Sequence, residues 1–251
     1  MSTNLEEEAD GTLHDEILIK QSESSYLGDC PICCLPISLD IDKSTMMTCC
    51  SKKICDGCVY SYEVRIFEQK LERTCPFCRQ LKPKTKDEGK KNIMKRVKAN
   101  DPVAMVQMCL RRYEAGDYES AFRYANKAAE LGHLGAHYHL SCFYREGRGV
   151  EKDVKKRVYH LGQAAIGGHA TARYNLGCEE DQNGRMDRAI KHWIIAAKLG
   201  HDDSLDNLNV CFRRGLVSKE DFAATLRAHQ AAVEATKSPQ REAAEEARKE
   251  W

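Results

Sequence analysis

The sequence predicts a small α+β domain stapled together by its cysteines, followed by an all-α solenoid of helix-pair repeats. Two observations predict this order. Nine of the 13 cysteines lie between residues 30 and 78, in a stretch with too few apolar residues to build a core of its own. From about residue 101 the apolar pattern is helical, and one helix end recurs after 36 and then 32 residues.

Changes in composition divide the chain into five segments. Residues 1–27 are rich in acids and are expected to form a disordered tail, whereas residues 237–251 are expected to form a charged, solvating C-terminal tail. The segments between them are a cysteine-rich domain at 28–80, a basic linker at 81–100 and three to four helical repeats at 101–236.

Charge and hydropathy exclude several classes of protein. Lys and Arg total 39 against 38 for Asp and Glu, so net charge favours neither nucleic acid nor a membrane as partner. The acidic N-terminus does not read as a secretory or transit signal, and no apolar run is long enough to span a membrane. We therefore expect an intracellular protein of the cytoplasm or nucleus. In that reducing environment cysteines are metal ligands or buried thiols rather than disulfides.

The motif Ala-Ala-x-x-Gly-His ends the repeats, except for a degenerate fourth copy. The three clear copies are residues 128–133, 164–169 and 196–201. In the preceding helices, apolar residues four positions apart share one face, as Ala136 and Leu140 do. One such helix pair cannot bury its apolar face alone, so the pairs are predicted to stack. Because the histidines recur at equivalent positions, they are interpreted as turn residues and not as metal ligands.

These residues resemble the Sel-1-like repeat, a relative of the tetratricopeptide repeat. The copy that matches its pattern best contains Leu140, Tyr144, Gly147, Gly149, Val150, Asp153, Lys156, Ala164, Ala165 and Gly168. The third copy shortens its loop to Asn183-Gly184, and the fourth, near Ala231, lacks the final glycine. The resemblance implies a surface that binds a protein substrate or scaffold. One cysteine in each first helix is interpreted as a small core residue: Cys109, Cys142, Cys178 and Cys211.

The cysteines of the first region come in four pairs. Three are C-x-x-C knuckles and one is an adjacent pair, which gives the set Cys30, Cys33, Cys49, Cys50, Cys55, Cys58, Cys75 and Cys78. Eight thiolates satisfy two closed tetrahedral sites, which are structural because no position is left for water or substrate. The pattern therefore predicts two zinc ions. The spacing does not suit an iron–sulfur cluster.

The order of the pairs resembles the RING finger. In that family the first and third pairs hold one zinc ion, and the second and fourth pairs hold the other. The resemblance implies one site from Cys30, Cys33, Cys55 and Cys58, and a second from Cys49, Cys50, Cys75 and Cys78. Most RING fingers have a histidine in the second pair, but no histidine lies between His14 and His133, so this looks like the all-cysteine variant. Adjacent cysteines share an ion only in a tight turn. Cys34 is the odd thiol.

The RING resemblance implies a ubiquitin ligase, which performs no covalent chemistry and positions a ubiquitin-conjugating enzyme that carries ubiquitin. Three residues match what that task uses. Ile32 and Pro76 are expected to form the apolar patch that docks the conjugating enzyme. Arg79 follows the last cysteine and is expected to bridge ubiquitin and its donor, because a guanidinium donates several fixed hydrogen bonds.

Two other functions stay open. In the first, the protein is a non-catalytic zinc-binding adaptor, in which Ile32 and Pro76 pack the knuckles and Arg79 is solvated. In the second, it binds nucleic acid through the basic run Lys82, Lys84, Lys86, Lys90, Lys91, Lys95, Arg96 and Lys98. No aromatic residue interleaves these bases, as base-stacking platforms normally require, so nucleic acid is not the expected partner.

Overall fold

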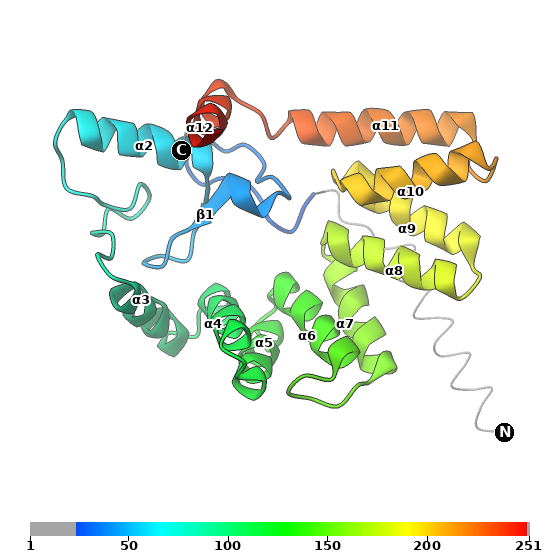
Figure 1. Cartoon of the computed structure of the whole chain (residues 1–251), viewed down its shortest axis with the longest axis horizontal. Helices are drawn as coiled ribbons and strands as arrows, with labels where there is room; N and C mark the ends of the chain where they lie inside the picture. The colour runs from blue at the N-terminus through cyan, green and yellow to red at the C-terminus, as the bar shows by residue number, and fades with distance from the viewer. Residues whose placement is uncertain (1–23, 250–251) are drawn as a thin grey trace. The chain divides into compact units, whose positions relative to one another are not determined.

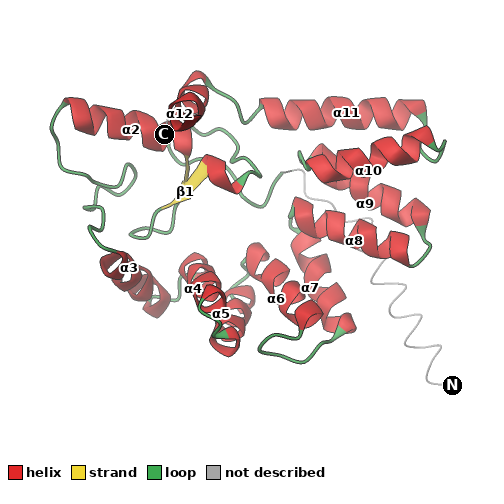
Figure 2. Cartoon of the chain, viewed as in Figure 1, coloured by secondary structure: helices red, strands yellow, loops and turns green. Residues whose placement is uncertain are grey.

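The computed structural model describes residues 24–249, so most of the predicted acidic tail and the last two residues lie outside the described part (Figure 1). The chain divides into two compact units. Among the described residues, one contains residues 27–136, 148–150 and 233–249; the other contains residues 24–26, 137–147 and 151–232. Helices dominate both units (Figure 2). Within residues 24–249, no helix has the length and apolarity needed to cross a membrane.

The cysteine-rich region of the first unit is a short hairpin followed by a helix. A 3-10 turn, η1 (Ile41–Lys43), leads into β1 (Ser44–Met46), which pairs antiparallel with β2 (Lys53–Cys55) in the register Thr45 opposite Ile54. Helix α2 (Asp56–Glu68) follows at once. The Thr45 hydroxyl donates to the Asp56 carboxylate at 2.9 Å, which ties the strand to the helix.

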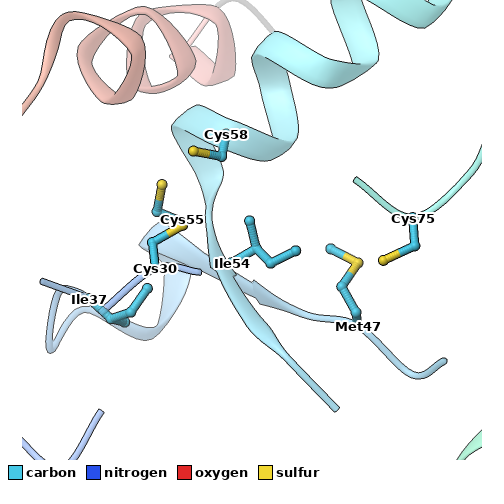
Figure 3. Packing of buried hydrophobic residues seen from close by; sticks show 7 residues of the cluster. All are labelled: Cys30, Ile37, Met47, Ile54, Cys55, Cys58 and Cys75. Atoms are coloured by element: carbon cyan, nitrogen blue, oxygen red, sulfur yellow. The ribbon is translucent and has the colours of Figure 1, made fainter. Parts of the chain in front are cut away.

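Most of the buried side chains in the core of this region contain sulfur. Ile37, Met47 and Ile54 are its buried apolar side chains, and the cysteines supply the rest. In Figure 3 the Ile54 side chain lies between Cys30, Cys55 and Cys58 on one side and Met47 and Cys75 on the other. So few buried apolar side chains cannot stabilise this domain alone. This agrees with the prediction that the cysteines supply additional cross-links.

The predicted basic linker is not an open linker. Its residues 86–98 form helix α3 (Lys86–Lys98), capped by the Thr85 hydroxyl, which accepts from the Glu88 N–H at 3.2 Å. Ile93 is only 1% exposed and packs with Ala104 and Met108 of the next helix. The high density of lysine hides these apolar positions in the sequence. Helix α3 therefore extends the helical array at its N-terminal end.

Helices α4 (Pro102–Glu114) and α5 (Tyr118–Glu130) form the first helix pair. Asp101 caps α4 by accepting from the Val103 and Ala104 N–H groups. Gly149 has a φ of +69°, and a Cβ there would lie 2.5 Å from the Tyr118 carbonyl oxygen. Only glycine permits this approach, which explains the second glycine of the Gly-x-Gly-Val loop.

Helix α12 (Pro239–Lys249) also belongs to the first unit and contacts α2 (Figure 1). The segment was predicted to be a charged, solvating tail. Instead, Ala244 is buried and Arg241 reaches into the cysteine-rich region. The prediction fails because the partner of this helix lies far away in the sequence.

The second unit contains most of the remaining helices. It holds most of α6 (Leu134–Glu146) and all of α7 (Val154–Ile166), α8 (Ala170–Gln182), α9 (Met186–Lys198) and α10 (Asp202–Arg213), and nearly all of α11 (Lys219–Glu234). Consecutive helices from α7 to α10 pack against one another. Gly177 on α8 has no room for a side chain, because a Cβ would lie 2.5 Å from Trp193 Nε1 on α9.

The repeated histidines are helix caps. The Nδ1 atoms of His133, His169 and His201 accept from the N–H groups of Ala136, Ala172 and Ser204, at 3.2 to 3.3 Å. Each histidine follows a glycine whose φ is 81° to 90°, the left-handed residue that ends the preceding helix. These bonds satisfy N–H groups that the start of a helix leaves unpaired. Their interpretation as turn residues is confirmed.

Candidate metal centre

The structure gathers the eight paired cysteines into two groups of four. One group is Cys30, Cys33, Cys55 and Cys58; the other is Cys49, Cys50, Cys75 and Cys78. In each group all four sulfur atoms lie within 4.8 Å of one another, and either group could hold a metal ion. Along the chain, the first and third cysteine pairs form one group, and the second and fourth pairs form the other. The two groups are therefore interleaved in the sequence.

The spacing of the sulfur atoms fits one tetrahedral ion in each group. Sγ–Sγ distances are 3.7 Å for Cys33 and Cys55, 3.9 Å for Cys50 and Cys75, and 3.4 Å for Cys49 and Cys78. Four thiolates around an ion at about 2.3 Å, as for zinc, stand about 3.8 Å apart. All of these cysteines are free thiols, so no disulfide competes for the sulfur atoms.

Three of the four pairs lie on loops with the same backbone. In the first loop the Cys34 N–H donates to the Cys30 carbonyl and the Cys30 N–H donates to the Leu35 carbonyl. The last knuckle repeats both bonds, from Arg79 to Cys75 and from Cys75 to Gln80. The residue after each second cysteine has a positive φ, 56° at Cys34 and 63° at Arg79. This backbone turns both sulfur atoms of a pair to one side.

The adjacent cysteines use the same loop. The Ser51 N–H donates to the Met47 carbonyl, the Met47 N–H donates to the Lys52 carbonyl, and Ser51 has a φ of 54°. Met47 thus stands where a knuckle has its first cysteine, Cys50 stands at the second, and Cys49 supplies the other thiol from within the turn. The tight turn that adjacent ligands require is therefore present.

The same comparison explains the ninth thiol. Cys34 occupies the position that Arg79 holds in the last knuckle, just beyond the paired cysteines, and it is exposed. It belongs to neither group of four. The remaining pair lies at the start of α2, where Cys55 is the N-cap residue and Cys58 is in the first turn.

Because the thiols in each group lie close together, ionising all of them is unfavourable unless a cation is present. Burial and neighbouring thiols raise the pKa of Cys50 to about 11, and they also raise the pKa of Cys58. Cys33 differs: burial raises its pKa, but hydrogen bonds from the Leu35 backbone and from Arg241 outweigh this and hold the pKa at about 7. A divalent cation would relieve the repulsion among the thiolates in both groups.

The three predicted docking residues differ in exposure. Ile32 is 42% exposed, but Pro76 is buried beside the fully buried Cys75, so it cannot present an apolar surface. The exposed apolar side chain of that knuckle is Phe77, also at 42%. Arg79 is exposed and lies over the Tyr62 ring, 4.8 Å from its centroid. Tyr62 is held in turn by a 2.6 Å hydrogen bond with Thr74.

Sequence reasoning missed Arg241 entirely. Its guanidinium lies 3.5 Å from Cys33 Sγ and also donates to the Leu35 and Pro36 carbonyls of the first loop. The two residues Cys33 and Arg241 are 208 positions apart, and no local pattern links them.

One residue before the cysteine-rich region contacts the helical repeats. The Tyr26 ring stacks on His169, with 4.1 Å between ring centroids, and the Tyr26 N–H donates to the Gly168 carbonyl at 3.3 Å. Tyr138 stacks on the same histidine at 4.5 Å. This end of the predicted disordered tail is therefore ordered on the repeats.

Comparison with known proteins identifies the repeats. Residues 102–133, 135–169 and 170–201 match the Sel1 repeat family. The solved structure of a Sel1 repeat protein from Oxalobacter formigenes superposes with a TM-score of 0.51 and 19% identity, covering 71% of this chain and 72% of that one. That likeness shows the fold, which is an all-helical repeat solenoid.

Two curated relatives are also similar. The mouse (Mus musculus) and rat (Rattus norvegicus) proteins named "DAP3-binding cell death enhancer 1" are 26% and 24% identical over 169 residues. The match covers 51% of this chain, which spans about a third of the length of those relatives. Helices α4 to α9 are three Sel1 repeats, a class of repeat that suggests protein–protein interaction.

Proposed function

We propose that this protein is a RING-type ubiquitin ligase, in which two zinc ions hold the cysteine-rich region and the Sel1 repeats bind a protein substrate or scaffold. The observation that carries the proposal is the alternating membership of the two cysteine groups, since each group takes every second pair. The Sγ spacing suits zinc, and four thiolates with no open position suit a structural ion.

The zinc ions in this proposal supply folding free energy and no chemistry. What the chain itself contributes is a surface that holds a loaded conjugating enzyme. Ile32 and Phe77 are the exposed apolar side chains of the two knuckles that begin with Cys30 and Cys75, and they replace the predicted pair of Ile32 and Pro76. Arg79 is an exposed residue whose guanidinium lies over the Tyr62 ring, and this suits it to the role of a bridging cation.

The proposal is tested by ubiquitin-chain assembly with the full chain, activating enzyme, a panel of conjugating enzymes and ubiquitin. Ile32→Ala should abolish chains, because an apolar anchor of the docking surface is lost. Ile41→Ala is the matched control: Ile41 is an isoleucine of the same region, 80% exposed and outside the knuckles, and chains should persist. Activity that survives Arg79→Ala would refute the bridging role alone.

A non-catalytic zinc-binding adaptor is the second candidate, favoured by the burial of Pro76, which removes one expected member of the docking patch. The same assay separates the two, because an adaptor builds no chains with any conjugating enzyme. The two relatives are named for binding DAP3, so DAP3 is the first partner to test on the repeats. Nucleic acid is not proposed, since Lys82 and Arg96 of the basic run are engaged by Glu63 and Asp101.

A further inference from the structure

Helix α12 is built against the cysteine-rich region at close range. Gly57, in the first turn of α2, has no space for a side chain, because a Cβ would lie 2.7 Å from the Arg241 backbone nitrogen and 2.9 Å from its Cα. Contact of this kind between two backbones requires a glycine on one side. Two ion pairs fasten the same helix, Arg248 with Asp56 and Glu245 with Lys43.

The Arg241 side chain is held in one orientation by four acceptors. Nη1 donates to the Pro36 carbonyl at 2.7 Å and to the Thr236 carbonyl at 2.6 Å. Nη2 donates to the Leu35 carbonyl at 3.1 Å and lies 3.5 Å from Cys33 Sγ. The Leu35 carbonyl also accepts from the Cys30 N–H, so the guanidinium joins the hydrogen bonds that shape the first knuckle.

The charge of this contact matters once a metal is bound. Four thiolates around a divalent ion leave a net negative charge, and a hydrogen-bond donor beside a metal ligand stabilises it and fixes its orientation. Arginine suits this position because its planar group keeps its charge and donates to several acceptors at once. Three of the four Arg241 contacts are to the loop of the first group and the fourth is to the Thr236 carbonyl, so the second group is an internal reference.

We propose that Arg241 is a positioning residue of the metal site formed by Cys30, Cys33, Cys55 and Cys58, and that metal binding there and docking of helix α12 stabilise each other. The proposal rests on the zinc sites of the proposed function and not on ligase activity. It makes the last helix of the chain a structural part of the first zinc site.

The test uses the full chain with zinc as the only added ligand. Native mass spectrometry counts the ions, and the rate of zinc transfer to a chromophoric chelator is followed for the wild type, Arg241→Ala, Arg241→Lys and Gly57→Ala. Arg227→Ala, an exposed arginine of α11, is the control. Hydrogen exchange of residues 239–249 is measured with zinc bound and after chelation.

We expect one of the two ions to leave Arg241→Ala at least about tenfold faster than it leaves the wild type, with the other ion unchanged. Gly57→Ala should release the same ion by displacing the helix, Arg241→Lys should be intermediate, and the control should match the wild type. Protection of residues 239–249 should fall on chelation. The inference would be overturned if zinc left the Arg241→Ala variant at the wild-type rate, or if residues 239–249 were equally protected with and without zinc. Either result would leave the zinc sites themselves intact. A wild-type chain that binds no zinc would overturn both.

Discussion

Gly57 and Arg241 are in direct contact, and an added Cβ on Gly57 would come within 2.7 Å of the Arg241 backbone nitrogen. The glycine therefore sets how closely α12 approaches α2.

Gly57→Ala should destabilise the cysteine-rich region by about 1–3 kcal/mol, because the helices must move apart to admit the methyl group. Gly89→Ala is the matched control. Gly89 also lies within a helix, but its Cβ would meet only Pro83 Cγ at 3.9 Å, so the change should stabilise by about 0.5–1 kcal/mol. Limited proteolysis of α12 and urea unfolding measure the difference. Equal stability of the two variants would mean that the close approach does not exist.

Glu180 is a second test, within the repeats. Its side chain is 1% exposed and pairs with Arg185 and Arg188. Glu180→Ala should cost about 2–3 kcal/mol in the free energy of unfolding, a moderate value because both arginines keep some access to water. Glu234→Ala, which breaks an exposed pair with Lys237, should change it by less than about 1 kcal/mol. Urea unfolding followed by circular dichroism measures both free energies of unfolding. Equal losses of stability in the two variants would contradict this account.

His160 makes the second unit sensitive to acid. Burial, the neighbouring His137 (Nδ1–Nδ1 3.0 Å) and Lys156 lower the pKa of His160 from 6.5 to about 4. The unfolded chain then binds the proton more readily, so this contribution to stability is complete above pH 6.5 and is lost as the pH falls towards 4. Thermal unfolding of wild type and His160→Phe should show a smaller fall in midpoint for the variant between pH 7 and 4.5. Parallel curves would exclude His160 as the cause.

Cys34 should be the reactive thiol of the cysteine-rich region. It is exposed and belongs to neither group of four, whereas metal-bound thiolates are shielded. Brief alkylation of the zinc-loaded chain, mapped by peptide mass spectrometry, should label Cys34 first among the nine cysteines of residues 30–78. After chelation the other eight should also be labelled. Early labelling of Cys49 or Cys50 in the loaded chain would remove them from the second site.

Much of the candidate site follows from local spacing. The C-x-x-C knuckles that begin at Cys30 and Cys75 bring their thiols together through bonds confined to six residues, so these pairs can be recognised without knowing the fold. The repeats were also predictable, because Gly-His after the second helix of each clear repeat marks the end of that helix and the cap of the next one.

The features that sequence reasoning missed depend on tertiary contacts. Met47 takes the place of a knuckle cysteine through its backbone alone, which leaves no trace in residue type. Pro76 was expected on the surface, but its burial depends on how the last knuckle packs. Arg241 reads as one more charge in a charged tail until the chain brings it to Cys33.

Native mass spectrometry of the full chain, purified under reducing conditions, tests the whole account most directly. In this account, residues 28–80 are held folded by two groups of four thiolates that bind metal, and not by apolar burial. The intact protein should therefore carry two zinc ions, which are released only when that region unfolds. A metal-free chain whose cysteine-rich region remained folded would contradict it.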